Sequence, residues 1–179
     1  MERGAEAAAR RSEGQHQLQC AFGRTLGGRE AIHPRLLNRD DEDNGHTTNP
    51  TGLPVGLAAA KDRALSFGFS TADVARCHVI GAQLGGFNLA VDYNLRPCWQ
   101  NPVNSPRMLR VENKVRRHAR GEVLIYSVTP VYLSSGSTVP WGFVMRASSS
   151  DPAGEVVWSD ATYVPNVRYR DGKALSLAN

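Results

Sequence analysis

The chain has 179 residues, 41% of them hydrophobic, and carries 21 Lys and Arg against 17 Asp and Glu. This length predicts one domain of ordinary size with a sizeable core. No apolar run approaches the roughly 18 residues of a membrane-spanning helix. Residues 1–19 also lack the apolar stretch of a secretory signal peptide. We therefore expect neither a membrane span nor a signal peptide.

The formal net charge of +4 is concentrated in the middle of the chain. Residues 46–120 hold ten Lys and Arg but only four Asp and Glu, whereas the segments on both sides are slightly acidic. A positive region on an otherwise nearly neutral chain indicates a polyanionic partner that is bound at one place.

The three cysteines are Cys20, Cys77 and Cys98. So few cysteines do not predict a disulfide framework. They contain no Cys-x-x-Cys pair either, so we expect no structural zinc site.

The chain divides into a lead-in over residues 1–46, a domain over residues 47–167 and a loose tail over residues 168–179. Glycines and the acidic run Asp40–Asp43 interrupt the lead-in, so it should be weakly structured. The acidic run could mimic nucleic acid and occlude a basic groove, but such runs are more often solvated loops.

Residues 51–57 resemble a turn that leads into a short strand, and residues 58–69 fit a helix or a strand equally well. Residues 73–80 alternate as a strand does and contain the tract Arg76-Cys77-His78. Gly85-Gly86 ends the element that begins there. Asn94 should then lie on an irregular loop that is punctuated by Pro97 and Pro102.

Ser105 and Pro106 predict a helix start, with Ser as the N-cap and Pro at the first helical position. The helix should continue to about Ala119, before Gly121. Its apolar face consists of Met108, Val111, Val115 and Ala119, and another face is basic: Arg107, Arg110, Lys114 and Arg117.

Glu112 falls on the apolar face of this helix, between Met108 and Val115. A carboxylate in such a position requires a partner. The basic face suits phosphate groups, although a solvent-exposed helix face is the simpler interpretation.

The remainder of the chain is rich in strands. Residues 122–132, 141–147 and 156–164 alternate or carry β-branched and aromatic residues, and a loop over 134–140 and a turn over 151–154 separate them. Together with the helix, they predict an α+β fold. The three tryptophans, Trp99, Trp141 and Trp158, fit core positions better than base-stacking ones.

An Arg beside a His, two Asn and one carboxylate match the needs of metal-assisted phosphodiester hydrolysis. A neutral imidazole can serve as a base near pH 7. Magnesium prefers oxygen ligands and keeps most of its waters. Arg binds phosphate bidentately and keeps its charge.

This arrangement resembles the DNA/RNA non-specific endonuclease family over roughly residues 50–165. Ala75-Arg76-Cys77-His78 corresponds to the family's Asp-Arg-Gly-His motif, and Asn94-Leu95-Arg96-Pro97 is similar to its Asn-Leu-Val-Pro tract. Asn104 and the helix residues Met108, Glu112 and Val115 follow in order. The Arg-Cys-His triplet is similar to that of bacterial toxin-type members.

The resemblance implies a ββα-metal finger with a central antiparallel sheet and flanking helices. By it, His78 is the general base, Arg76 contacts the phosphate, and Asn94 orients the metal-site loop or a phosphate oxygen. Asn104 is the magnesium ligand, and Glu112 binds a metal-coordinated water.

Basic side chains would bind the nucleic acid: Arg96, Arg107, Arg110, Lys114 and Arg117. Two positions depart from the pattern. Ala75 replaces the family's Asp, unless Asp73 substitutes for it, and Cys77 replaces the Gly. Arg63 is a candidate for the second phosphate-binding Arg.

The implied function is a sequence-tolerant endonuclease that acts on DNA, with RNA left open, and uses Mg²⁺, with Mn²⁺ as the alternative. The toxin-type likeness further implies an interbacterial effector with an immunity protein. A specialised secretion route would deliver it to the target-cell cytoplasm. The alternative from another class is a non-catalytic nucleic-acid-binding module.

Overall fold

A computed structural model describes residues 35–37, 53–84, 86, 94–118 and 123–179. Short helical turns η2 (Thr71–Asp73), η3 (Ala82–Leu84) and η4 (Gln100–Met108) accompany the longer elements. In chain order these are β1 (Arg35–Leu37), α1 (Leu57–Ser66), β2 (Val74–His78), β3 (Leu95–Trp99), α3 (Leu109–His118), β4 (Val123–Val131), β5 (Gly142–Ser150), β6 (Val156–Pro165), β7 (Val167–Arg170) and β8 (Lys173–Ser176). Within the described ranges, no helix has the length and apolarity needed to cross a membrane.

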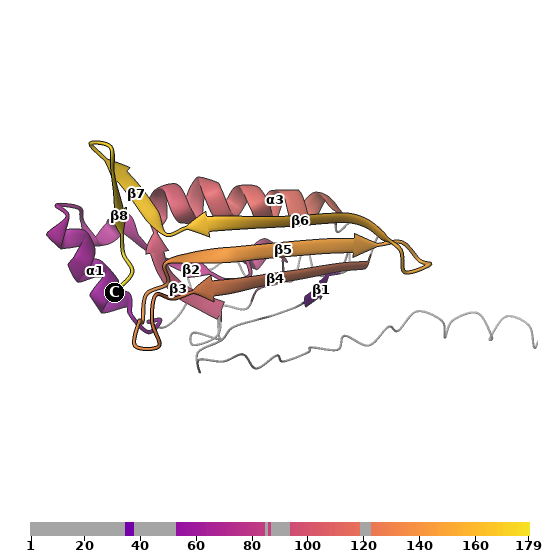
Figure 1. The fold of residues 1–179 in the computed structure, drawn as a ribbon, viewed down its shortest axis with the longest axis horizontal. Helices are drawn as coiled ribbons and strands as arrows, with labels where there is room; N and C mark the ends of the chain where they lie inside the picture. Colours follow the sequence, from indigo (N-terminus) through magenta and orange to yellow (C-terminus); the bar gives the residue numbers. More distant parts are fainter. Residues whose placement is uncertain (1–34, 38–52, 85, 87–93, 119–122) are drawn as a thin grey trace, which may run out of the picture.

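A four-stranded antiparallel sheet forms the centre of the molecule, in the order β1-β4-β5-β6. Helix α3 runs alongside its long strands (Figure 1). Alternation along β5 turns Phe143, Met145 and Ala147 into the core and leaves Val144 and Arg146 more exposed. The predicted α+β fold with a central antiparallel sheet is confirmed, and its three long strands lie close to their predicted positions.

Strands β2 and β3 form a separate antiparallel ribbon in which His78 pairs with Leu95. Residues 95–99 are thus a strand, not the irregular loop that Pro97 suggested. A two-stranded ribbon leaves one edge of each strand unpaired, so a strand here can contain Pro.

A disulfide joins Cys77 of β2 to Cys98 of β3, with a Cα–Cα separation of 5.9 Å. The sequence did not predict this bond. Three cysteines do not reveal whether two of them lie diagonally across a ladder, as Cys77 and Cys98 do here. Both are fully buried, so the cross-link lies inside the core.

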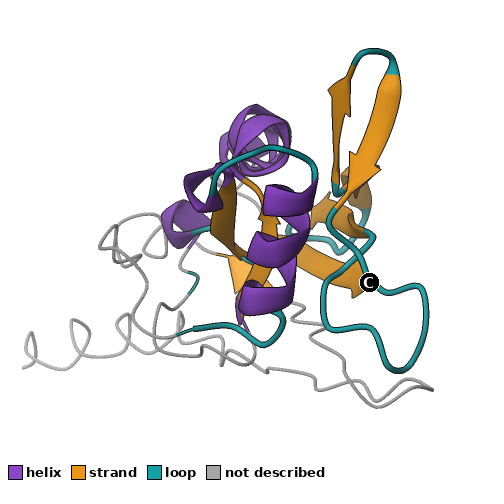
Figure 2. Ribbon diagram, turned by 90° about the vertical axis from the view of Figure 1, so that its left-hand side faces the viewer, coloured by secondary structure: helices purple, strands orange, loops and turns teal. Residues whose placement is uncertain are grey.

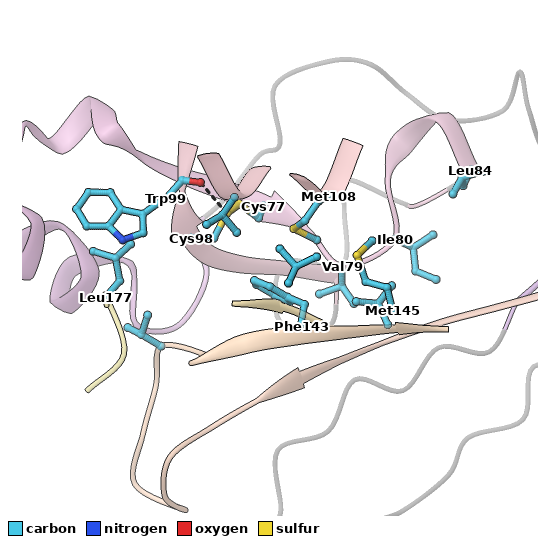
Figure 3. Close-up of a cluster of buried hydrophobic side chains, with 14 of the residues drawn as sticks. Cys77, Val79, Ile80, Leu84, Cys98, Trp99, Met108, Phe143, Met145 and Leu177 are labelled. Carbon is cyan, nitrogen blue, oxygen red and sulfur yellow. Dashed lines mark hydrogen bonds between the residues drawn. A yellow bond between two sulfur atoms is a disulfide. The ribbon is translucent and has the colours of Figure 1, made fainter. Parts of the chain in front are cut away.

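The main core lies between the ribbon, η4 and the central sheet (Figure 3). Val79 and Met108 approach it from the ribbon side, and Phe143 and Met145 approach it from β5. All four are at most 1% exposed. This packing fixes the end of β2 relative to the helix that follows η4.

Residues 57–66 form helix α1, so the short strand predicted over residues 51–57 is wrong where the structure describes that segment. Leu57, Ala60 and Ala64 share one face at helical spacing and are buried. Gly56 precedes them with φ 85°, a left-handed conformation that favours glycine.

The regular part of α3 begins at Leu109, three residues after Pro106, the predicted first helical position. Asn101 and Ser105 have extended backbone angles within η4, which interrupt the helical path. The helix ends at His118, and the predicted end at Ala119 lies outside the described residues.

Residues 168–179 are not the loose tail that the sequence suggested. Strands β7 and β8 form a hairpin that projects beside α1 (Figures 1 and 2). Leu177 and Ala178 are buried, and Asn179 Oδ1 accepts hydrogen bonds from the backbone N–H groups of Thr138 and Val139. Most of the predicted lead-in lies outside the described residues, but Arg35–Leu37 pairs with β4.

Candidate active site

The site begins at the end of β2. Because successive side chains of a strand point to opposite faces, Arg76 and His78 share one face and Cys77 faces the other. Cys77 is buried, whereas Arg76 and His78 are both half-buried. The core thus holds the strand through Cys77 and leaves the Arg and His on the accessible side.

Asn94 holds the chain just after His78. Its Oδ1 accepts a hydrogen bond from the Ile80 N–H at 2.8 Å, and its Nδ2 donates to the Ile80 carbonyl at 3.1 Å. The Asn94 carbonyl also accepts from the Val79 N–H at 2.7 Å. Asn94 is only 5% exposed, so this geometry supports the loop-orienting role rather than the direct phosphate contact.

The chain then turns through η3 toward α3. The N–H groups of Leu84 and Gly86 both donate to the Gly81 carbonyl. A Cβ on Gly86 would overlap the Ile80 carbonyl, so only glycine fits there. This packing closes a compact loop directly after His78.

Glu112 of α3 seats its carboxylate on this loop. Gln83 Nε2 donates to Glu112 Oε2 at 3.1 Å, and the Gly81 backbone N–H donates to the same carboxylate. Glu112 is 8% exposed, as expected from its position between Met108 and Val115. Val79 and Ile80 therefore separate His78 in sequence from Gly81, which contacts the carboxylate on the helix.

Burial raises the pKa of Glu112 to about 7, although the hydrogen bonds from Gln83 and Gly81 oppose this shift. In the described part of the chain, no basic side chain forms an ion pair with Glu112. A buried carboxylate without a cationic partner is the electrostatic setting that a divalent cation stabilises.

Asn104 lies in η4, which packs against both β2 and β3. Its side chain is half-buried, and its Nδ2 donates to Gln100 Oε1 at 3.1 Å. This bond occupies the amide nitrogen, so Oδ1 is the atom suited to a metal. Among the described residues no cluster of three His, Cys, Asp or Glu side chains could hold a metal. A donor set of one amide oxygen and one carboxylate fits magnesium, which keeps most of its waters.

The four basic residues of η4 and α3 that the sequence predicts to bind nucleic acid divide into two pairs. Arg107 donates to the Val167 carbonyl at 3.3 Å, and Lys114 pairs with Asp160 at 3.1 Å beside Trp158. Arg110 and Arg117 are exposed. The first pair therefore contributes to docking of the helix, although Lys114 keeps 42% of its side chain exposed, and the second pair lies on the exposed surface.

Three other predicted residues have structural contacts instead. Arg96 is 8% exposed, and its Nε donates to the Tyr132 hydroxyl, so it is not a surface contact for nucleic acid. Asp73 caps η2 and pairs with Arg168 at 2.7 Å, which lowers the pKa of Asp73; it does not replace the missing Asp at Ala75. Arg63 donates to the Ser176 carbonyl.

Sequence reasoning missed Gly81 and Gln83, although both lie in the tract after His78. It also missed Tyr126 on the inner face of β4, which is fully buried. The Tyr126 hydroxyl has no hydrogen-bond partner among the described residues. Burial and the nearby Glu112 charge raise its pKa well above the usual value. Gly81, Gln83 and Tyr126 lie near Glu112 only in the folded chain, so their neighbours in the sequence give no signal of this proximity.

Comparison with known proteins agrees with this architecture. The magnesium-bound NucA of Streptococcus agalactiae is similar at a TM-score of 0.58 and 17% identity, covering 86% of this chain and 72% of that one. The zinc-bound Sda1 nuclease is similar at 0.56 and 19% identity, covering 89% and 80%. An extracellular endonuclease is similar at 0.53 and 16% identity, covering 89% and 87%. No curated protein matches the chain.

A β-ribbon with a His at its end, packed beside a helix that carries the carboxylate, is the ββα-metal class of nuclease fold. The model of the DNA/RNA non-specific endonuclease family matches residues 62–151, half of the chain. The chain belongs to this family, and it is accordingly a hydrolase of the endonuclease type.

Proposed function

We propose that the protein is a metal-dependent, sequence-non-specific endonuclease that hydrolyses phosphodiester bonds of DNA, with RNA as a further substrate to be tested. One observation carries the proposal: Asn94 and the Gly81–Leu84 loop bring the His78 strand and the buried Glu112 together. Such an arrangement supports a site in which a base and a metal-binding carboxylate act together.

His78 acts as the general base and takes a proton from the water that attacks phosphorus. The new P–O bond forms as the bond to the leaving oxygen breaks, and the leaving oxygen then takes a proton from solvent. Arg76, on the same face of β2, binds a non-bridging phosphate oxygen and offsets its charge. Asn94 keeps the end of the strand in position.

Asn104 Oδ1 and the Glu112 carboxylate, directly or through water, would hold the metal, and magnesium is the ion that best fits such oxygen donors. When bound, a divalent cation offsets the charge that develops on the phosphate and the leaving oxygen. The magnesium bound in NucA and the zinc bound in Sda1 support a metal requirement. Manganese is the alternative ion to be tested.

Plasmid nicking tests the enzymatic function. The wild-type protein should nick supercoiled DNA with magnesium and lose this activity with EDTA. His78→Ala should lower the rate about 10²–10⁴-fold, because a general base typically contributes that much, while its thermal unfolding and its affinity for DNA in EDTA stay close to wild-type. DNA binding without nicking under any metal would favour a non-catalytic module instead.

We further propose that this nuclease is the toxin domain of an interbacterial effector, supported by the Arg76-Cys77-His78 triplet alone. It would act in the target-cell cytoplasm after delivery by a specialised secretion system, and an immunity protein would protect the producer. Expression in a bacterial cytoplasm should degrade the host DNA, and His78→Ala should be harmless. Survival of hosts that express a nuclease-active wild-type protein would contradict the toxin role.

A further inference from the structure

We propose that the loop from Gly81 to Leu84 is a positioning element for the metal site, with Gln83 as its specific hydrogen-bond donor. The inference rests on the proposed function, in which Glu112 contributes to metal binding. It assigns a role to two residues that touch neither the reacting phosphate nor the attacking water.

The contacts of the Glu112 carboxylate carry this inference. Gln83 Nε2 lies 3.1 Å from Oε2, and the Gly81 N–H donates to the same group. A Cβ built on Gly81 would lie 2.6 Å from the Cδ and from both carboxylate oxygens of Glu112. The carboxylate therefore rests directly on the Gly81 backbone, and Gln83 fixes its rotation.

The loop can hold a carboxylate in place because it is itself fixed at both ends. Asn94 brackets Ile80 on its N-terminal side, and the Gly86 N–H bonds back to the Gly81 carbonyl on its C-terminal side. Leu84, 1% exposed, anchors it in the core. Both donors thus belong to a rigid segment that begins three residues after His78.

The substitution Gly81→Ala tests the contact with the Glu112 carboxylate without straining the backbone. Gly81 is not among the glycines with positive φ, so alanine can adopt its conformation. The added methyl group would act by displacing the Glu112 carboxylate. Gly136→Ala is the matched control, because the nearest atom to its added Cβ is 3.9 Å away and its φ is also not positive.

Gln83→Met tests the hydrogen bond, since methionine has a similar length and no N–H donor. The readout is the affinity of the protein for Mn²⁺ in the absence of nucleic acid, measured by calorimetry and checked by electron paramagnetic resonance. Gln83→Met and Gly81→Ala should each weaken Mn²⁺ binding about tenfold, the low end of the effect of outer-shell partners. Gly136→Ala should leave it unchanged, and the melting temperatures identify any misfolded variant.

The decisive comparison repeats both substitutions in a Glu112→Gln background. If the loop acts through the carboxylate, the additional loss of Mn²⁺ affinity should largely disappear there. An equal loss in both backgrounds would overturn the positioning role, as would unchanged affinity in a folded Gln83→Met protein. If Glu112→Gln alone leaves Mn²⁺ binding intact, the metal site of the proposed function is wrong and the positioning role falls with it.

Discussion

At the scale of single residues, the burial of Glu112 makes the stability of the protein depend on pH. The pKa of Glu112 in the folded protein is about 7, above the ordinary value of 4.5, because burial disfavours its charged form. The folded state therefore binds a proton more tightly than the unfolded state does. The stability that this proton contributes is complete below pH 4.5 and is lost as the pH rises toward 7.

We therefore predict that the metal-free protein becomes less stable between about pH 4.5 and 7. Each pKa unit corresponds to about 1.4 kcal/mol, so the loss is at most on the order of 3 kcal/mol. Urea unfolding in EDTA at several pH values would measure it. Glu112→Gln, which cannot ionise, should lack this part of the pH dependence. Identical pH profiles of the two proteins would contradict the assignment to Glu112.

Metal binding should have the opposite effect to ionisation of Glu112 and should raise the stability of the protein. A bound divalent cation favours the ionised carboxylate, so adding Mg²⁺ at pH 7 should restore stability to the wild-type protein by mass action. Glu112→Gln should gain less at the same Mg²⁺ concentration. This difference connects a stability measurement to the proposed metal site without using activity.

At the scale of elements, η4 and α3 present basic residues to two different environments. Arg107 and Lys114 contact β7 and β6, whereas Arg110 and Arg117 are exposed. Sequence periodicity placed all four on one face. The packing of the helix against the sheet then separated them, because residues 107 and 114 lie closer to the buried side of the helix.

We predict that Arg110→Ala with Arg117→Ala weakens DNA binding and reduces the slope of log affinity against log salt concentration by up to about two. Binding should be measured in EDTA between 50 and 200 mM salt, conditions that separate phosphate contacts from cleavage. Arg146→Ala is the control, since it removes an exposed charge from β5 on the strand face opposite the buried Met145 and Ala147. An unchanged slope in the double variant would place the nucleic acid elsewhere.

The Cys77–Cys98 disulfide cross-links the ribbon that carries His78, with 21 residues of sequence separation. Closing a loop of this size should contribute about 3 kcal/mol to stability. We predict that dithiothreitol, or the double change Cys77→Ala and Cys98→Ala, lowers the urea midpoint of unfolding. Cys20→Ser should leave it unaltered. A wild-type midpoint that is insensitive to dithiothreitol would show that the bond contributes nothing.

In a target-cell cytoplasm, where we propose that the protein acts, thiols are kept reduced, so the Cys77–Cys98 disulfide would be reduced. The reduced ribbon would still be held by its hydrogen-bonded ladder and by the buried side chains around it. Nicking assays with and without dithiothreitol, at a temperature where both forms are folded, would show whether the cross-link is needed for activity or only for stability.

At the scale of the whole molecule, the C-terminal hairpin closes the side of the domain that contains α1. Arg168 pairs with Asp73 and lies 4.2 Å from the centre of the Phe69 ring. Trp99 Nε1 donates to the Leu175 carbonyl, and Leu177 is fully buried. The end of the chain is therefore an integral part of the core.

We predict that Leu177→Ala destabilises the protein by about 2–5 kcal/mol, the usual range for a buried leucine. Lys173→Ala, at an exposed position of the same hairpin, should change the stability by no more than about 0.5 kcal/mol. Thermal and urea unfolding would measure both. Equal stability of the two variants would mean that the end of the chain is dispensable after all.

Local periodicity and local chemistry in the sequence were enough to predict several features. Alternation over residues 73–80 predicted the strand that carries Arg76 and His78. Helical spacing placed Glu112 on the buried face of α3. The motif of the endonuclease family came from the same short stretches. These inferences succeeded because each depends only on residues within about one turn or one strand of each other.

Only the tertiary structure decided which distant residues meet. It paired Cys77 with Cys98, turned Arg96 inward to Tyr132, and seated Glu112 on Gly81 and Gln83. It also built a hairpin from a stretch that is too short and too polar to predict. The disulfide and the contacts of Arg96 and Glu112 join segments about 20 or more residues apart, and their formation depends on the packing of the whole core rather than on the preference of any segment.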